Sequence, residues 1–366
     1  MKRRWTYLIR ILSARIVLHN KSKMIFKSHY FKITAFIICL ISFSCYFKNY
    51  AAADFEKKTI RYDGKTREYF IYVPSSYNGK EHAPLLMVFH GGGGKAENFA
   101  RFTGFDNLSE KYGFISVYPE GIEGHWNDGR ESEKFKAQDK EIDDIAFVIV
   151  LLEKLQSSYN IDKNQIFATG MSNGGVFCQR LAAEQPQHFA AVASVTAQIA
   201  EPLSKRFNPQ EPISVLIMNG TRDPLMPYSG GEVKDPDFFP LLSRFRQKPS
   251  RGRVLSTDET IRLWLKHDQI ATPPITDEMP DLDNDKVTVE RKEWKNRDKG
   301  VSVVLYKING GGHTWPGGKQ YLPEKIIGKT CMDIQASEVI WDFFSKNKKQ
   351  GSLTNRSSGP QKVRGR

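Results

Sequence analysis

Short apolar runs and amphipathic stretches alternate along most of this chain. Continuous apolar runs bounded by turn residues are typical of buried strands, whereas apolar positions at helical spacing are typical of helices that cover a sheet. The runs that predict strands are 84–91, 115–121, 164–170, 189–197, 214–220, 286–294 and 301–308. The stretches that predict helices are 105–114, 142–159, 174–186, 257–269 and 337–347.

The first of these elements follows a segment of a different kind. Residues 57–77 contain two alternating runs joined by Asp63 and Gly64, which predicts a β-hairpin. An antiparallel start followed by repeated strand and helix predicts an α/β fold, with a mostly parallel central sheet, helices on both faces and an antiparallel N-terminal hairpin. In an open sheet of this type the active site lies at the carboxyl ends of the strands.

The net charge of +13 on 366 residues has its origin in the two ends of the chain. Residues 1–53 carry ten Lys and Arg and residues 346–366 carry seven, and neither end carries an acidic residue. Residues 54–345 carry 37 basic and 41 acidic residues, a net charge of −4. A nucleic-acid partner is therefore not expected, because its groove would require basic residues on the folded body.

The basic N-terminal end contains a pattern typical of a secretory signal. Ile33–Phe47 is an apolar run of fifteen residues preceded by lysines, and an A-x-A cleavage pattern ends at Ala53. The run is short for a membrane-spanning helix, and an uncleaved anchor is the alternative. We expect residues 1–53 to be an N-terminal extension and signal peptide, starting at Met1 or Met24. The mature protein would then be secreted or periplasmic, without stable membrane association.

The remaining chain divides into a folded domain and a tail. Residues 54–346 hold the predicted elements, apart from the last residue of helix 337–347, whereas residues 347–366 are basic and have few apolar side chains to bury, which predicts a disordered tail. Cys178 and Cys331 lie in the domain and could pair in an oxidising compartment. Cys178 also falls on the predicted core side of its helix, where an unpaired cysteine is common, so the sequence leaves the pairing open.

The segment FATGMSNGG, residues 167–175, raises the question whether Ser172 is a nucleophile or a turn serine. A G-x-S-x-G match alone is weak, but here a predicted strand precedes it and a predicted helix follows, as in a nucleophile elbow. Gly170 and Gly174 are the positions where a Cβ would collide with the neighbouring strand and helix. Ser172 also lies at a helix N-terminus, where the dipole favours developing negative charge.

A nucleophilic serine needs a base and a carboxylate that orients that base. In elbow-type folds the acid and then the histidine follow the serine, each on a loop after a strand. Asp223 and His313 occupy such loops, after strands 214–220 and 301–308. Taken singly, Asp223 could be a turn-forming residue and His313 a solvent-facing one. Their agreement in order and position predicts a catalytic triad with Ser172.

Attack on a carbonyl creates a negative oxygen that needs preorganised N–H donors. We expect one donor to be the amide of Asn173 and the other to come from Gly91, Gly92 or Gly93. Glycines there let the backbone approach a substrate without side-chain collision, and a flexible linker turn is the alternative. We expect His90 to support this loop and not to take part in the chemistry.

Seven motifs occur in a fixed order along the chain, and together they carry a resemblance to a known family. They are HGGGG (90–94), WNDGR (126–130), IDDIAF (142–147), GMSNGG (170–175), GTRDPLMPYSGG (220–231), RGRVLS (251–256) and GGGHTWPGG (310–318). The set resembles the secreted esterases that include polyhydroxybutyrate depolymerases, feruloyl esterases and acetyl-xylan esterases, over roughly residues 56–346.

The resemblance implies an α/β-hydrolase fold for the catalytic domain, residues 54–346, and ester hydrolysis through an acyl-enzyme without a metal or cofactor. A serine esterase of the polyhydroxybutyrate depolymerase type is the expected function, and a feruloyl or acetyl-xylan esterase is the alternative. The implied substrate is accordingly a hydroxyalkanoate oligomer or an acylated carbohydrate. Many members carry a cysteine pair just after the Trp-Asn segment, where this chain has RESEKFKAQDKE. We expect no polymer-binding module after the domain, and the oligomeric state is left open.

Aromatic residues near the motifs are the candidates for substrate contact. Trp315 and Tyr228 lie beside members of the predicted triad and could line a pocket or pack within the fold. Trp126 could contact the rim of the site or fill it. Residues 229–256 are typical of an insertion over the active site, and a lid or an acyl pocket is the hypothesis for them.

Two further functions compete with ester hydrolysis. A serine peptidase of the prolyl oligopeptidase type would use the same triad, but we expect no propeller or large accessory domain in this chain. A noncatalytic surface-binding protein on a hydrolase scaffold is disfavoured because Ser172, Asp223 and His313 are all intact.

Overall fold

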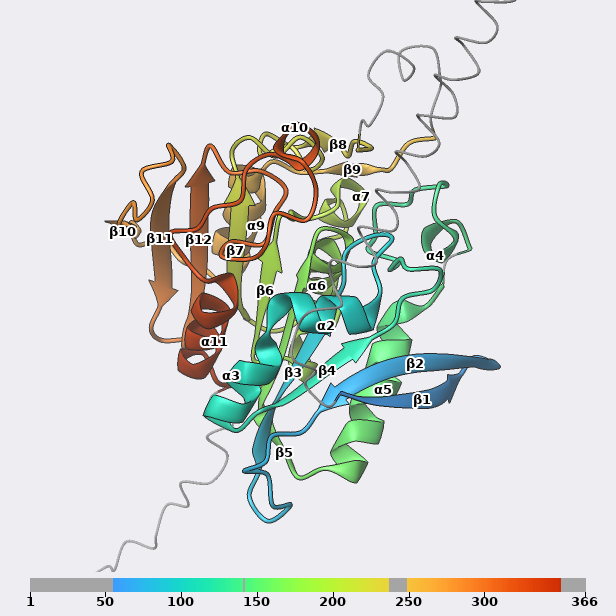
Figure 1. Ribbon diagram of the computed structural model, residues 1–366. Coiled ribbons are helices and arrows are strands. Elements are labelled where there is room, and N and C mark those ends of the chain that lie inside the picture. Colours follow the sequence, from blue (N-terminus) through green and yellow to red (C-terminus); the bar gives the residue numbers. More distant parts are fainter. Residues whose placement is uncertain (1–54, 141, 237–248, 350–366) are drawn as a thin grey trace, which may run out of the picture. The chain divides into compact units, whose positions relative to one another are not determined.

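A ten-stranded mixed β-sheet forms the centre of the computed structural model, which describes residues 55–140, 142–236 and 249–349 (Figure 1). Its strand order is β1-β2-β4-β3-β5-β6-β7-β12-β11-β10. The strands are β1 Glu56–Tyr62, β2 Lys65–Tyr72, β3 Ala83–Phe89, β4 Ile115–Pro119, β5 Ile161–Met171, β6 Ala191–Val195, β7 Ser214–Gly220, β10 Ile275–Glu278, β11 Thr288–Asn296 and β12 Val301–Asn309. A separate two-stranded ribbon pairs β8 (Gly231–Glu232) with β9 (Arg253–Val254).

Helices connect these strands. They are α2 Ala96–Thr103, α3 Phe105–Tyr112, α4 Lys136–Asp139, α5 Asp144–Ser158, α6 Asn173–Glu184, α7 Glu201–Ser204, α9 Thr257–His267, α10 Glu324–Ile327 and α11 Ala336–Lys346, with a 3₁₀ turn at Pro186–His188. The apolar periodicity predicted the longer ones. It missed α2, whose eight residues directly follow the glycine-rich loop.

The middle of the sheet is parallel and its two edges are antiparallel. β4, β3, β5, β6, β7 and β12 pair in parallel, whereas β1, β2, β11 and β10 pair antiparallel. The predicted hairpin is present, because Asp63 and Gly64 both have positive φ angles and join β1 to β2. The expected architecture is therefore confirmed.

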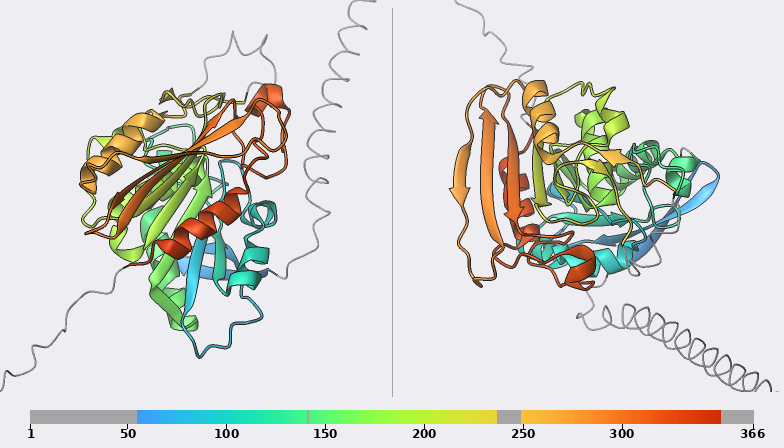
Figure 2. Two further views of the ribbon diagram at one scale, coloured as in Figure 1. Left: turned by 90° about the vertical axis from the view of Figure 1, so that its left-hand side faces the viewer. Right: turned by 90° about the horizontal axis from the view of Figure 1, so that it is seen from above.

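Helices cover both faces of the sheet (Figures 1 and 2). Alternate residues of β3 show how, since Leu85, Met87 and Phe89 pack in the core beneath α5, α6 and α9, whereas Leu86 and Val88 pack beneath α2, α3 and α11. Strands that are buried on both faces must be apolar at nearly every position, which explains the continuous apolar runs of the sequence.

The described structure continues through residue 349, whereas the tail was expected to start at residue 347. Asn347 Oδ1 accepts hydrogen bonds from Ser214 Oγ at 2.8 Å and from Ser302 Oγ at 2.9 Å, at the starts of β7 and β12. Polar contacts with strand ends therefore hold these residues, although they have no apolar side chains to bury. The rest of the predicted tail, 350–366, lies outside the described residues.

The predicted signal also lies outside the described residues, which begin at Phe55. Within the described ranges, none of the helices combines the length and the apolar character that crossing a bilayer requires.

Candidate active site

Ser172 occupies a sharp turn between β5 and α6. Its φ of 55° and ψ of −122° are uncommon for a residue other than glycine. The backbone is held from both sides, because Ser172 N donates to Val195 O at 2.9 Å and Ser172 O accepts from Val176 N at 2.8 Å. Ser172 is partly exposed, although both neighbouring residues are buried. This is the geometry expected of a nucleophile elbow.

The two glycines of the motif permit this turn, as the sequence predicted. A Cβ on Gly170 would lie 2.7 Å from Phe89 O and from the carbonyl carbon of Gly174. A Cβ on Gly174 would overlap Phe89 O and His90 O. Strand β3 and helix α6 therefore approach the elbow more closely than any other residue type would allow.

Asp223 and His313 form a direct pair. His313 Nδ1 lies 2.7 Å from Asp223 Oδ2, and both side chains are almost fully buried. Asp223 Oδ1 accepts from the amides of Leu225 and Met226, both at 2.8 Å. An ionised carboxylate only accepts, so Nδ1 carries the proton and Nε2 of His313 is left as the basic nitrogen.

The sheet brings these loops together. β5, β6, β7 and β12 are successive neighbours, so Ser172, Asp223 and His313 all follow strands that end at one edge. Backbone bonds continue past the strand ends, and Arg222 N donates to Gly311 O at 2.9 Å. Among the described residues, no hydrogen bond joins Ser172 to His313. Such a bond is often long before a substrate binds.

His90 fixes the glycine-rich loop, as expected. Its Nε2 accepts from Gly121 N at 3.0 Å, so its Nδ1 is the protonated nitrogen and donates to Gly91 O at 2.9 Å. Burial lowers the pKa of His90 and keeps the ring neutral. A Cβ on Gly91 would lie 3.5 Å from Ser172 Cβ, which places this loop against the elbow.

One of the predicted oxyanion donors in this loop already donates a hydrogen bond within the fold. Gly93 N donates to Gly124 O at 2.9 Å, so its N–H is not available to a substrate. This corrects the expectation for Gly93, because the loop folds back on the segment around Gly124. Gly91 and Gly92 are the loop residues whose amides are candidate donors.

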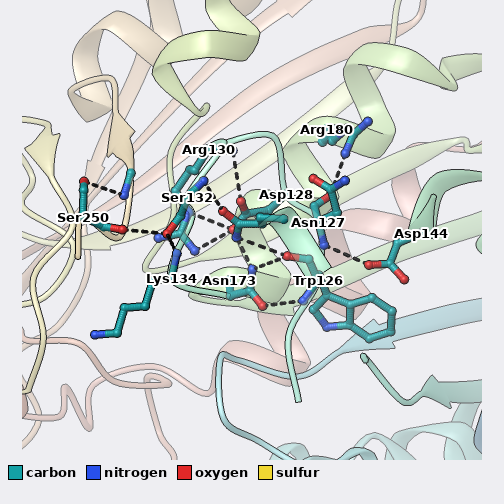
Figure 3. A network of polar contacts seen from close by, with 12 residues as sticks. Trp126, Asn127, Asp128, Arg130, Ser132, Lys134, Asp144, Asn173, Arg180 and Ser250 are labelled. Atoms are coloured by element: carbon teal, nitrogen blue, oxygen red, sulfur yellow. Dashed lines mark hydrogen bonds and ion pairs between the residues drawn. The ribbon is translucent and has the colours of Figure 1, made fainter. Parts of the chain in front are cut away.

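The side chain of Asn173 is clamped by a polar network (Figure 3). Its Oδ1 accepts from Trp126 N at 2.8 Å, and its Nδ2 donates to Trp126 O at 3.0 Å and to Asp128 Oδ2 at 2.6 Å. Arg130 forms an ion pair with the same oxygen of Asp128 at 2.7 Å, and both of these side chains are buried. The network holds the first residue of α6, whose amide has no acceptor within the helix.

Sequence reasoning missed the roles of Asp128 and Arg130. The only signal was the motif WNDGR itself, which places an acid and a base two residues apart. Nothing in that spacing points to Asn173, which is more than forty residues away along the chain. The contact exists because the loop after β4 packs against the start of α6.

A second buried acid extends the network toward the N-terminal hairpin. Asp144 Oδ2 accepts from Asn127 N and Oδ1 accepts from Arg67 Nη2, both at 2.9 Å. Burial raises the pKa of Asp144, which the charge of Arg67 opposes. Arg180 of α6 donates to Asn127 O at 2.8 Å. The segment that clamps the elbow is thus tied to β2, α5 and α6.

Trp126 and Trp315 pack within the fold and do not line an open pocket. Of the two roles considered for each, substrate contact is therefore corrected to packing. Trp126 is fully buried, stacks on Phe177 and donates from Nε1 to His90 O at 3.1 Å. Trp315 is 2% exposed and donates from Nε1 to Ser337 Oγ at 3.1 Å. Both rings fill the fold beneath the site because their apolar bodies pack and their N–H groups find buried acceptors.

Tyr228 is the aromatic candidate that is partly exposed beside the Asp223 loop. Its hydroxyl donates to Asp258 Oδ1 at 3.4 Å, and burial and that acid raise its pKa. The lid hypothesis falls partly outside the described residues, because residues 237–248 of the segment are not among them. Cys178 and Cys331 are both free and buried, so they do not pair.

Comparison with known proteins identifies the family of this chain. The family model described as "Esterase PHB depolymerase" matches residues 67–201. The putative esterase NocK of Nocardia uniformis subsp. tsuyamanensis is 30% identical over 282 residues, which cover 77% of this chain and 80% of NocK. The chain belongs to the esterase family of the α/β hydrolases. The activity of this esterase is carboxylic ester hydrolysis.

Two further relatives are more distant. Probable feruloyl esterase C of Aspergillus niger is 26% identical over 173 residues, which cover 45% of this chain and 58% of the feruloyl esterase. The bifunctional acetylxylan esterase/xylanase XynS20E of Neocallimastix patriciarum is 24% identical over 302 residues, which cover 82% of this chain but only 36% of XynS20E. The solved acetyl xylan esterase from Aspergillus awamori superposes with a TM-score of 0.50 at 16% identity. The superposition covers 80% of this chain and 99% of the acetyl xylan esterase. This likeness supports the expected α/β-hydrolase fold.

Proposed function

We propose that Ser172, Asp223 and His313 are the catalytic triad of this esterase. The observation that carries the proposal is the 2.7 Å contact of His313 Nδ1 with Asp223 Oδ2, at the sheet edge where Ser172 occupies a strained turn. With Nδ1 held by the carboxylate, Nε2 is the atom that takes the proton of Ser172 Oγ.

The reaction then proceeds by acyl transfer to water. Ser172 Oγ attacks the ester carbonyl while His313 Nε2 accepts its proton, and Asp223 stabilises the imidazolium that forms. His313 returns the proton to the leaving alcohol, which leaves an acyl-enzyme on Ser172. A water molecule, deprotonated by His313, attacks the acyl-enzyme. The acid is released when Ser172 Oγ leaves and takes the proton back from His313.

The tetrahedral intermediate needs donors for its negative oxygen. The amide of Asn173 is one proposed donor, because it opens α6 and the Asp128 network holds its side chain. The amides of Gly91 and Gly92 are the proposed donors on the other side, since their loop lies against Ser172. Preorganised donors of this kind each contribute about 10²–10³ to kcat.

We propose hydroxyalkanoate esters as the substrate, as in a polyhydroxybutyrate depolymerase, and secretion through the predicted signal. The description of the matching family model supports the first and the N-terminal sequence pattern supports the second. Acylated plant carbohydrates are the second candidate, which the names of the feruloyl and acetylxylan esterase relatives favour. Relative turnover of hydroxybutyrate oligomers, methyl ferulate and acetylated xylan separates the two.

Replacing the nucleophile tests the triad. We expect Ser172→Ala to lower kcat for p-nitrophenyl butyrate by about four to six orders of magnitude and to abolish labelling by a fluorophosphonate probe. Ser157→Ala is the matched control, because Ser157 is exposed on α5 and its hydroxyl donates to Lys154 O of the same helix. Undiminished hydrolysis or labelling of the Ser172 variant, with the control also active, would contradict the proposal.

A further inference from the structure

His125 lies beside the glycine-rich loop and takes no part in the proposed acyl transfer. Its ring stacks on Phe135, with centroids 4.0 Å apart and planes at 20°. Its Nδ1 lies 3.1 Å from Glu123 O. A stacked ring with one nitrogen bonded has a defined orientation, so the position of its second nitrogen is also defined.

The contacts decide which nitrogen carries the proton. A carbonyl oxygen only accepts, so Nδ1 of His125 is the donor to Glu123 O. Burial lowers the pKa of His125, and the nearby charges of Arg251 and Arg130 lower it further. The ring is therefore neutral near pH 7, and Nε2 presents a lone pair that can accept a hydrogen bond.

This lone pair lies at the proposed oxyanion loop. A Cβ on Gly92 would lie 3.1 Å from His125 Nε2 and 3.6 Å from Asn173 Cβ. Within the described part of the chain, no group donates a hydrogen bond to Nε2. This unpartnered nitrogen is not fully buried. His125 is partly exposed, so Nε2 is reached by solvent. An accessible acceptor thus lies beside Gly92, one of the residues of the proposed oxyanion loop.

We propose that His125 determines substrate specificity by accepting a hydrogen bond from a substrate hydroxyl close to the scissile carbonyl. The inference rests on the proposed function of Ser172 and the oxyanion loop, and it narrows the substrate to hydroxylated esters. The hydroxyl can belong to a hydroxyacyl group or to a polyol or sugar on the alcohol side. Both present the same O–H donor to Nε2, and an alkyl group at that place leaves the acceptor unpaired.

Matched pairs of esters test this role. p-Nitrophenyl 3-hydroxybutyrate is compared with p-nitrophenyl butyrate for the acyl side, and glyceryl monoacetate with ethyl acetate for the alcohol side. We expect the wild-type kcat/KM to favour the hydroxylated member of at least one pair by about tenfold, the equivalent of one hydrogen bond. The pair that shows the preference identifies the side on which the hydroxyl lies.

Variants of His125 separate a substrate contact from a structural role. His125→Phe keeps a ring to stack on Phe135 but removes the acceptor, so we expect the preference ratio to fall about tenfold. His125→Gln keeps an acceptor oxygen and should retain part of the ratio, and it serves if the Phe variant does not fold. His82→Phe is the control, because His82 is exposed before β3, at the opposite end of that strand from the site.

The outcomes are distinguishable. A ratio that falls in the His125 variants but not in the His82 variant supports the role. Equal rates for both members of each pair in the wild type would overturn it while leaving the triad intact, and so would a ratio that His125→Phe does not change. Hydrolysis of none of the four esters by the wild type would overturn both this role and the proposed function.

Discussion

At the scale of single residues, the proposed chemistry depends on the tautomer of one imidazole. Asp223 selects that tautomer, because its Oδ2 holds the Nδ1 proton of His313 while two amides hold its other oxygen. An amide at this position would present a similar shape without the charge. The orientation of His313 is therefore a property of the carboxylate and of the loop that follows β7.

We expect Asp223→Asn to lower kcat by about 10⁴, because the amide stabilises the wrong tautomer and cannot stabilise the imidazolium. The measurement is steady-state hydrolysis of p-nitrophenyl butyrate, with the thermal midpoint recorded in parallel. Asp298→Asn is the control, because Asp298 is exposed in the turn between β11 and β12. A loss of less than tenfold in a folded Asp223 variant would argue against its proposed place in the triad.

A single methyl group on Gly174 tests the close approach at the elbow. Gly174→Ala would force a Cβ onto Phe89 O and His90 O, so we expect a destabilisation of more than about 3 kcal/mol or loss of folded protein. Gly79→Ala is the comparison, since Gly79 has a φ of 74° but open space around it. Its cost should be only the backbone strain, about 1–2 kcal/mol. Urea unfolding measures both, and equal costs would contradict the collision.

At the scale of elements, caps and packing determine where helices begin. α9 starts at Thr257, as the sequence predicted, and Ser256 is its N-cap. Ser256 Oγ accepts from Glu259 N at 3.1 Å, and Glu259 Oε2 accepts from Ser256 N at 2.9 Å. This capping box leaves Thr257 free for a buried contact with Asn219 Nδ2 at 2.9 Å.

We expect Ser256→Ala to lower the free energy of unfolding by about 1 kcal/mol at pH 7. The hydrogen bonds from Ser256 lower the pKa of Glu259. A lowered carboxylate pKa contributes stability above its unfolded value of about 4.3 and loses it as the pH falls through the folded pKa. The cost of Ser256→Ala should therefore be smaller at about pH 3 than at pH 7.

Chemical denaturation at the two pH values measures this difference. Ser345→Ala is the control, because Ser345 is exposed near the end of α11 and its hydroxyl donates to Asp342 O of the same helix. We expect its cost to be within about 0.5 kcal/mol at both pH values. A cost of Ser256→Ala that grows as the pH falls would mean that the link to Glu259 is wrong.

At the scale of the whole molecule, one buried ion pair connects distant parts of the chain to the site. Arg67 of β2 contacts Asp144 of α5 at 2.9 Å, and their side chains are 3% and 0% exposed. Arg67 also stacks on Phe147, 3.7 Å from the ring centroid. Asp144 in turn holds Asn127, next to the residues that clamp Asn173.

Breaking this pair should destabilise the protein strongly. We expect Arg67→Met to cost about 3–5 kcal/mol, because it leaves the Asp144 carboxylate buried without its partner charge. Arg67→Met with Asp144→Leu should cost less than the sum of the two single changes. Guanidinium unfolding of the four proteins measures the coupling, and strict additivity would show that the two charges do not depend on each other.

The sequence by itself determined the longer elements other than α2 and the order of the site. Buried parallel strands must be apolar at nearly every position, and elbow-type folds place acid and histidine after the serine, so local pattern and chain order were enough for β3, β7, β12 and the proposed triad. These features depend on neighbouring residues or on order along the chain.

Only the tertiary structure decided the features that depend on contacts between distant residues. They include the burial of Trp126 and Trp315 and the hydrogen bond from Gly93 N to Gly124 O. They also include the hydrogen bond from Asn173 to Asp128 and the unbonded Nε2 of His125. A residue's type alone does not decide whether its side chain packs in the core or faces a substrate, nor which partner its polar atoms find. Which of these it does is settled by what the fold places within about 3 Å of its atoms.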